Sequence, residues 1–244
     1  MPRTDSGERI YAIGDIHGRY DLLRLLLDRV GEHAERLHPA ESLHIIFLGD
    51  LVDRGPDSAK VVDFLYGLTQ STDQAIVLMG NHEEAMLRSI EGNANILKRW
   101  LSVGGAETIE SYGLQKFDSR DDGRQYIRYL QSSLPAHHLQ WLRDLPLTAQ
   151  SGDYFFCHAG IRPGVALARQ DREDLLWIRD GFVDDHSEHG AVIVHGHTIE
   201  RSVTMRENRI GIDTGAYCYG VLTALYLEDD RREVISVSEN ELVS

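Results

Sequence analysis

The chain repeats one local pattern, in which a short apolar run is followed at once by glycine and by a side chain that can bind a metal. The clearest example is the run Leu43–Leu48, which is followed by Gly49, Asp50, Asp53 and Arg54. A β-branched, aromatic run of this length predicts a buried strand. Asp50 then lies at the carboxyl end of that strand, which is the edge where open α/β sheets bind ligands. Two carboxylates and a guanidinium are costly to desolvate, so this edge predicts a site for a cation and a phosphate.

Three strand–turn–helix units of this kind open the chain and predict a parallel sheet covered by helices. Their strands are expected at Arg9–Ile13, Leu43–Leu48 and Ala75–Met79. Further strands are expected at 154–157, 191–194, 201–205, 209–212, 221–227 and 233–237. The last four have short connections and predict an antiparallel meander that forms a second sheet.

Residues 92–145 carry only helical patterns, broken at Gly104-Gly105 and at Asp121-Asp122-Gly123. This stretch is predicted to be a helical cap inserted between sheet segments, at the mouth of the site. No linker separates a second domain. The expected organisation is a single domain over residues 9–240, with the cap insertion at about 92–145 and an N-terminal tail over residues 1–8.

Composition narrows the function classes. The balance of 25 basic against 39 acidic residues gives 25 − 39 = −14, which opposes non-specific binding to nucleic acid. The chain has no apolar run long enough to span a bilayer and no signal-peptide core at its start, so the expectation is a cytoplasmic protein that binds neither membrane nor nucleic acid. The two cysteines, Cys157 and Cys218, are too few for a disulfide framework or a cysteine-based zinc site.

Five turns that follow apolar runs carry metal-competent side chains. They are Asp15 with His17, Asp50, Asn81 with His82, His158, and His195 with His197. The donors are oxygen and imidazole nitrogen without thiolate, a set that suits Mn, Fe or Zn better than Ca. Six ligating side chains are too many for one tetrahedral ion, so two ions that share a carboxylate are expected, with Asp50 as the bridge. Two metals about 3.5–4 Å apart can hold a hydroxide that is aimed for in-line attack on phosphorus.

Together these blocks resemble the calcineurin-like metallophosphoesterases. The motifs that carry the resemblance are Gly14-Asp15-Ile16-His17-Gly18, Gly49–Gly55, Gly80-Asn81-His82-Glu83, His158-Ala159-Gly160 and Gly196-His197. More narrowly, the chain resembles the bacterial branch of the phosphoprotein phosphatase (PPP) family of Ser/Thr phosphatases, from about Arg9 to Leu227. The resemblance implies an α/β fold, a β-sandwich of two mixed sheets flanked by helices (α/β/β/α) with a helical cap insertion.

The resemblance also implies a role for each matching residue. The implied metal ligands are Asp15 and His17 for the first ion, Asp50 as the bridge, and Asn81, His158 and His197 for the second. The implied catalytic residues are His82 as general acid, Asp53 as its orienting partner, and Arg54 and Arg179 on the phosphate. Asn81, Arg162 and Tyr217 are further candidates for substrate binding, and His195 is expected to hydrogen-bond near the ligands. The cofactor is expected to be two divalent ions, Mn²⁺ ahead of Fe or Zn.

The expected function is hydrolysis of phosphomonoesters on phosphoserine and phosphothreonine proteins by a monomeric enzyme, with a phosphoprotein or phosphopeptide as partner. The alternative is a symmetrical diadenosine tetraphosphate hydrolase, which uses the same core. The presence of Asp53, and of Glu83 after His82, favours the protein phosphatase. A catalytically inactive scaffold is disfavoured because no ligand is missing from the set.

Overall fold

The computed structural model describes residues 1–92, 94–118 and 120–243, and in it ten strands form two sheets. The strands are β1 (Glu8–Ile13), β2 (Ser42–Phe47), β3 (Ala75–Val77), β4 (Thr148–Ser151), β5 (Tyr154–Cys157), β6 (Val192–His195), β7 (Thr204–Met205), β8 (Arg209–Gly211), β9 (Val221–Glu228) and β10 (Arg231–Ser238). The α-helices are α1 (Tyr20–Glu35), α2 (Ser58–Ser71), α3 (Asn81–Ile90), α4 (Ala94–Trp100), α5 (Ala106–Ser111), α6 (Gly123–Ser133), α7 (Ala136–Arg143), α8 (Arg172–Trp177) and α9 (Ala216–Tyr219).

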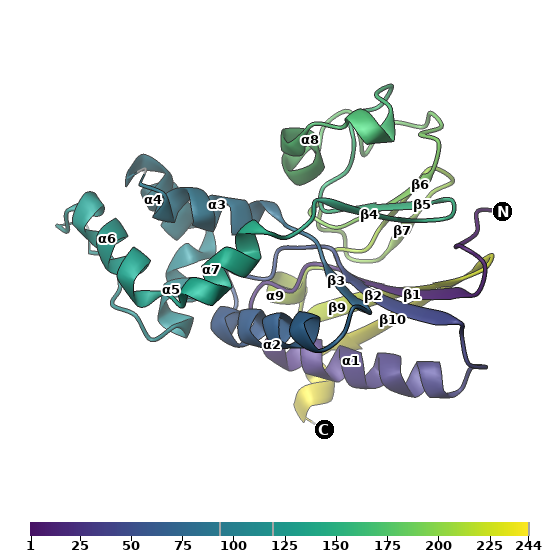
Figure 1. Cartoon of the computed structure of the whole chain (residues 1–244), viewed down its shortest axis with the longest axis horizontal. Coiled ribbons are helices and arrows are strands. Elements are labelled where there is room, and N and C mark those ends of the chain that lie inside the picture. The colour runs from purple at the N-terminus through teal and green to yellow at the C-terminus, as the bar shows by residue number, and fades with distance from the viewer. Residues whose placement is uncertain (93, 119, 244) are drawn as a thin grey trace.

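The two sheets pack face to face, with helices on both outer faces (Figure 1). The first sheet has the strand order β10-β9-β1-β2-β3 and the second has the order β4-β5-β6-β8-β7. Helices α1 and α2 cover the outer face of the first sheet, and α8 lies over the second. Both sheets mix parallel and antiparallel pairs. The predicted α/β/β/α sandwich of two mixed sheets flanked by helices is therefore confirmed.

Alternation along β1 explains why its last four residues, Ile10–Ile13, are all apolar. Ile10 and Ala12 belong to the buried cluster between the two sheets, whereas Tyr11 and Ile13 belong to the cluster beneath the helices. Successive side chains of a strand point to opposite faces, so a strand that is covered on both faces needs apolar residues at every position. The parallel pairing of β1 with β2 brings Ile13 opposite Phe47, so both strands end at the same edge of the sheet.

The predicted antiparallel meander of the last four strands is wrong. Strands β7 and β8 belong to the second sheet, but β9 and β10 return to the first, where β9 pairs antiparallel with β1 and brings Ala224 opposite Ile13. Strand periodicity identifies a strand but not its partner. Six successive residues of β9 are buried, as in β1, because β9 lies inside a sheet that is covered on both faces.

Helices α4 to α7 project away from both sheets, beside α3 (Figure 1). Their buried side chains, among them Trp100, Ile109, Leu130 and Leu142, continue the cluster that packs beneath the first sheet. This helical part is called the cap below. The domain limits of 9–240 and the cap limits of 92–145 stay predictions. None of the described helices is long and apolar enough to cross a membrane.

Candidate metal centre

Polar side chains from the carboxyl ends of strands in both sheets converge on Asp50, which follows β2. The Nε2 atom of His17 lies 3.4 Å from Oδ2 of Asp50, and the Nε2 atom of His158 lies 3.4 Å from its Oδ1. All three side chains are buried. Loops that follow β1, β2 and β5 thus deliver two imidazoles to the two oxygens of one carboxylate.

Backbone carbonyls fix the direction of both imidazole rings. The Nδ1 atom of His17 donates to the carbonyl oxygen of Val52 at 2.9 Å, and that of His158 donates to the carbonyl oxygen of Leu48 at 2.9 Å. A carbonyl oxygen only accepts, so the proton of each neutral ring is on Nδ1 and the lone pair of Nε2 faces Asp50. This is the arrangement in which protein imidazoles bind metal ions.

The other predicted ligands lie in the same place. The backbone N–H of His197 donates to Oδ2 of Asp15 at 3.0 Å, and Oδ1 of Asn81 lies 2.8 Å from Nε2 of His158. With the proton of His158 on Nδ1, this second contact sets two lone pairs against each other. A cation between the imidazole and the amide oxygen would turn that repulsion into two bonds.

Charge and burial at the centre also fit cations. Burial, reinforced by Asp213 and Asp50, raises the pKa of Asp15 well above its usual value, and burial raises that of Asp213 to about 6. Burial likewise lowers the pKa of His17 to about 3 and that of His197 to about 2, so both rings are neutral. A divalent ion would relieve the repulsion among the carboxylates and would use the neutral rings as ligands.

Two groups of possible ligands share Asp50. One joins it to His17 and His82, the other to His158 and His197, and within each group the ligand atoms lie within 4.8 Å of one another. The Nε2 atom of His197 is buried and has no hydrogen-bond partner among the described residues. The raised pKa of His82 keeps that ring protonated, so it is not counted as a ligand, but the neutral rings of His17, His158 and His197 around the shared carboxylate fit a pair of metal ions.

Asp213 lies at the centre but was not predicted from the sequence. It follows β8, which pairs parallel with β6, so its carboxylate comes to the same edge as the loop that carries His197. Asp213 is buried, and its Oδ2 atom has no hydrogen-bond partner in the described chain. The signal was present, because an aspartate directly after a predicted strand is the same pattern that identified Asp50.

Beside the centre, His82 is held by the fully buried carboxylate of Asp53. The Nδ1 atom of His82 donates to Oδ2 of Asp53 at 2.6 Å. Burial lowers the pKa of His82, but Asp50 and Asp53 outweigh it and raise the value to about 9. The ring is thus protonated at neutral pH, with its Nε2 atom 4.0 Å from Oδ2 of Asp50. It can donate a proton at the edge of the centre.

Two residues of the cap hydrogen-bond to Asp53, the partner of His82. Nε1 of Trp100 donates to Oδ2 of Asp53 at 2.9 Å, and Oγ1 of Thr108 donates to Oδ1 at 2.7 Å. The hydroxyl of Thr108 also accepts from the backbone N–H of Asp53 at 2.8 Å. Residues from α4 and α5 therefore satisfy the carboxylate that orients His82. Neither residue was predicted from the sequence, because neither belongs to a strand-end motif.

Glu83 hydrogen-bonds to the loops after β2 and β3 and holds them together. Its buried carboxylate accepts from the backbone N–H groups of Asp50 at 2.9 Å, Leu51 at 2.8 Å, Val52 at 3.1 Å and Gly80 at 2.8 Å. A Cβ added at Gly80 would meet the backbone nitrogen of Asp50 at 2.2 Å, so only glycine allows the two loops to approach this closely.

Backbone strain is concentrated at the same place. Six described residues other than glycine have positive φ angles, and five of them are His17 (45°), Asp50 (49°), Asp53 (75°), Arg54 (70°) and His197 (62°). Such conformations cost about 1–3 kcal/mol each and persist only where the surroundings enforce them. The hydrogen bonds of Glu83 and the contacts of the cap with Asp53 help to hold the backbone in these conformations.

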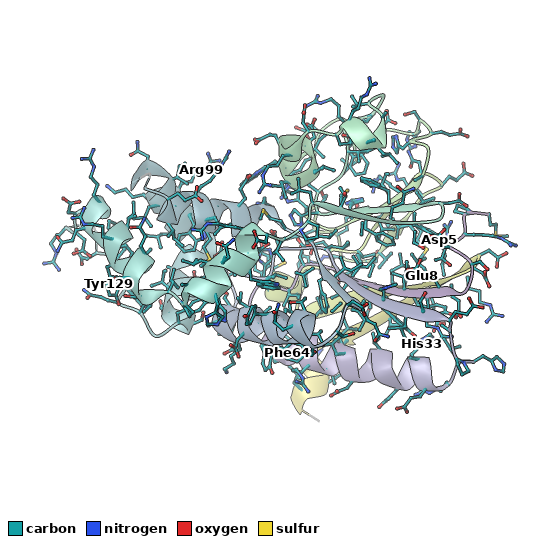
Figure 2. The ribbon with its side chains drawn as sticks, in the orientation of Figure 1. Asp5, Glu8, His33, Phe64, Arg99 and Tyr129 are labelled. Atoms are coloured by element: carbon teal, nitrogen blue, oxygen red, sulfur yellow. The ribbon has the colours of Figure 1, made fainter. Side chains whose placement is uncertain are left out.

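A cavity of about 430 Å³ opens between the centre, the cap and α8. Its lining residues are Arg54, Asn81, His82, Ala85, Arg88, Ile96, Arg99, Trp100, Val103, Glu173, Trp177, Arg179 and His197. Four are arginines and one is acidic, although the chain as a whole carries a charge of −14. Arg99 lies on α4 in the cap (Figure 2). This space is called the cleft below, and its positive charge favours an anionic ligand.

One wall of the cleft is fixed by a bridge between α3 and α8. Glu84 accepts from Nε1 of Trp177 at 2.8 Å through one oxygen and from Nε of Arg172 at 2.8 Å through the other. The half-buried indole of Trp177 is therefore held at the cleft, and Arg179 follows it two residues later. Arg179 is exposed and its guanidinium has no hydrogen-bond partner in the described part of the chain.

The remaining candidates lie outside the cleft. Both guanidinium arms of Arg162 bind Asp174, with Nε at 2.7 Å from one of its oxygens. Tyr217 stacks under Arg54, with the guanidinium carbon 4.4 Å from the ring centre, and its hydroxyl accepts from Arg54 at 2.6 Å. The Nδ1 atom of His195 lies 3.0 Å from the carbonyl oxygen of Gly196, the residue before His197.

Comparison with known proteins bears on the whole chain. The family model for calcineurin-like phosphoesterases matches residues 8–220. The asymmetrical bis(5'-nucleosyl)-tetraphosphatase PrpE of Oceanobacillus iheyensis is 26% identical over 96% of this chain and 93% of that protein. A symmetrical bis(5'-nucleosyl)-tetraphosphatase of Dechloromonas aromatica is 33% identical, over 65% of this chain and 46% of that protein. A crystal structure provisionally named a diadenosine tetraphosphatase superposes with a TM-score of 0.65 at 22% identity, over 98% of both chains.

These relatives correct the expected function. The prediction of a phosphatase for phosphoserine and phosphothreonine proteins, with a phosphoprotein or phosphopeptide as partner, is wrong, because the curated relatives that span most of the chain are named bis(5'-nucleosyl)-tetraphosphatases. The narrower assignment to the PPP branch is not supported either. The alternative of a symmetrical diadenosine tetraphosphate hydrolase agrees better with these names, most of which, however, are of asymmetrical enzymes.

Proposed function

Because the chain belongs to the calcineurin-like phosphoesterase family, we propose that it is a metal-dependent hydrolase of dinucleoside tetraphosphates. In this reaction water attacks one phosphorus of the tetraphosphate chain, one P–O bond breaks, and the leaving nucleotide departs as a phosphate anion. Relatives that span nearly the whole chain are named asymmetrical tetraphosphatases. We therefore expect diadenosine tetraphosphate to give ATP and AMP.

The observation that carries this proposal is the arginine-lined cleft beside the centre. Arg54 and Arg179 lie near the centre, whereas Arg88 and Arg99 belong to α3 and α4, on the side of the cap. A substrate with a single phosphate could occupy only the first of these regions. A chain of four phosphates is long enough to reach the second, where guanidinium groups suit phosphate oxygens.

Apolar surface in the cleft complements the arginines. Trp177, Ile96 and Val103 line it, and each keeps part of its side chain exposed. A nucleobase presents a flat π-face, and stacking of a base on an aromatic side chain contributes about 1–3 kcal/mol. The cleft therefore offers surfaces for both parts of a nucleotide, which a site built for a phosphate alone would not need.

At the centre, the residues proposed to hold two divalent ions are Asp15, His17, Asp50, Asn81, His158 and His197, with Asp50 shared between the ions. Mn²⁺ is the ion we propose, with Fe or Zn as alternatives, because the donors are imidazole, carboxylate and amide without thiolate. Bound there, the ions would act as Lewis acids on phosphoryl oxygens and would lower the pKa of water.

The side chains beside the metal ligands are proposed to bind the phosphate and to protonate the leaving group. Arg54, held in place by the ring of Tyr217, is proposed to bind oxygens of the phosphate under attack. His82 is proposed to be the general acid, because its ring is protonated and Asp53 fixes its direction. A nucleotide phosphate is a better leaving group than an alkoxide, so His82 contributes less with this substrate than the roughly 10²–10⁴-fold typical of general acids.

Product analysis tests the proposal. Purified protein reconstituted with Mn²⁺ is incubated with diadenosine tetraphosphate, and the nucleotides are separated by anion-exchange chromatography. Equal amounts of ATP and AMP are expected. Two molecules of ADP would overturn the asymmetrical cleavage but keep the substrate class. Hydrolysis of p-nitrophenyl phosphate with diadenosine tetraphosphate left intact would overturn the substrate class itself.

A further inference from the structure

A second cluster of metal-competent side chains lies away from the catalytic centre, where the cap meets α2. Asp63 belongs to α2, and His137 and His138 stand at the start of α7. The ligand atoms of these three side chains lie within 4.8 Å of one another. None of the three lines the cleft.

His138 carries the observation that points to a ligand. Its side chain is only 6% exposed, and its Nε2 atom has no hydrogen-bond partner among the described residues. That atom lies 3.4 Å from Oδ1 of Asp63, an ion-pair distance that is longer than the roughly 2.7–3.2 Å of an ordinary N–H···O hydrogen bond. A buried ring nitrogen without a partner loses its hydration and gains nothing in return. A metal ion at this position would satisfy it.

The opposite side of the ring is already fixed. The Nδ1 atom of His138 lies 3.1 Å from the hydroxyl of Tyr112, which can accept its proton. When Nδ1 donates to this hydroxyl, the lone pair of the neutral ring is on Nε2, on the side of Asp63, and a second-side hydrogen bond of this kind is typical of metal-binding histidines. Burial lowers the pKa of His138, which favours the neutral ring that a metal requires.

The distances suit a tetrahedral ion. Zinc bonds to imidazole nitrogen and carboxylate oxygen are about 2.0–2.2 Å long, so neighbouring ligand atoms of a tetrahedral site are about 3.3–3.6 Å apart. The separation of 3.4 Å between Nε2 of His138 and Oδ1 of Asp63 matches that edge. The rings of His137 and His138 are 4.4 Å apart between centres, which puts the second imidazole beside the first. The fourth position would face solvent and take a water molecule, because Asp63 and His137 are exposed.

We propose that Asp63, His137 and His138 form a binding site for one Zn²⁺ ion, separate from the catalytic centre. The ion joins α2, which covers the first sheet, to α7 of the cap, and so ties the cap to the sandwich. Helix α2 also reaches the catalytic loop, because Oγ of Ser58 at its start accepts from the backbone N–H of Asp53 at 3.0 Å. The proposal does not depend on the substrate of the enzyme.

Metal counting tests the site. The whole protein is dialysed against buffered Zn²⁺, and bound zinc is measured by elemental analysis for the wild type, for H137A and for D63A. Both substitutions replace exposed side chains that are outside the catalytic machinery, so the fold is expected to survive. The control is H38A, which removes an exposed histidine outside the cluster.

The wild type and H38A are expected to bind the same number of zinc equivalents, and H137A and D63A one equivalent fewer. A zinc-dependent rise in the melting temperature should also shrink in H137A and D63A, because binding to the folded state stabilises it. If either H137A or D63A keeps the full number of equivalents, the three-residue site is overturned. Loss of diadenosine tetraphosphate hydrolysis has no bearing on this count, so failure of the proposed function would be distinguishable.

Discussion

Replacing Arg99 with alanine tests whether the cap side of the cleft binds the polyphosphate chain. Arg99 is exposed on α4, and its guanidinium has no hydrogen bond or ion pair with any residue in the described ranges. Its removal therefore leaves no buried partner unsatisfied, and the free energy of unfolding should change by less than about 0.5 kcal/mol. An effect on catalysis then reports on a contact with the substrate.

The magnitude follows from where the side chain lies. A hydrogen bond to a charged group contributes about 1.5–3 kcal/mol when it is shielded, and an exposed ion pair about 0.2–1 kcal/mol. Arg99 is an exposed residue of the cleft, so we expect its removal to cost about 1–1.5 kcal/mol of transition-state stabilisation. This corresponds to roughly a 5- to 12-fold loss of kcat/KM. The loss should appear for diadenosine tetraphosphate and should shrink at high ionic strength. A substrate with one phosphate should lose less than about twofold.

Steady-state kinetics on diadenosine tetraphosphate and on p-nitrophenyl phosphate, measured side by side, provide the assay. R124A is the matched control, because Arg124 is also an exposed arginine of the cap but belongs to α6 and does not line the cleft. Equal losses on both substrates for R99A, or the same loss for R124A, would refute the inference that the cleft binds an extended phosphate chain.

Three further predictions concern the centre. T108V removes the hydroxyl that hydrogen-bonds to the carboxylate and to the backbone N–H of Asp53, so the free energy of unfolding should fall by about 2 kcal/mol in urea denaturation. An unchanged urea midpoint would contradict the role of the cap in holding Asp53. E83Q replaces a carboxylate that accepts four backbone N–H groups, so the free energy of unfolding should fall by about 3 kcal/mol in calorimetry, more than for E107Q at an exposed glutamate. Exhaustive chelation should abolish hydrolysis and Mn²⁺ should restore it, whereas full activity in the chelated protein would exclude the metal centre.

The strand ends around the centre were predictable because the information is local. A buried strand is apolar over four to six residues, and the aspartate, asparagine or histidine after it stands out against that background. Parallel strands bring such residues to one edge, so Asp15, Asp50 and Asn81 could be assigned to a common site without coordinates. The two-sheet architecture followed from the same motifs through the family resemblance.

Partners that come from distant elements were not predictable in this way. The pairing of β9 with β1 depends on which strand edge remains uncovered after the first sheet forms, and periodicity does not record that. Trp100 and Thr108 reach Asp53 only because α4 and α5 pack against the loop after β2. In the sequence they are ordinary residues of amphipathic helices. Asp213 is different, because its strand was predicted and only the residue after it was overlooked.

The error about the substrate has a physical explanation in the same structure. Asp53 and Glu83 favoured a protein phosphatase, yet Glu83 binds backbone amides and Asp53 orients His82. Both residues hold parts of the centre in place, and neither of these contacts involves the group that would depart. In the proposed function the leaving nucleotide extends into the cleft instead, where the cap contributes Arg99. Motifs at strand ends therefore predict the metal centre and the family, whereas under the proposed function the choice of substrate depends on cap residues that lie outside every motif.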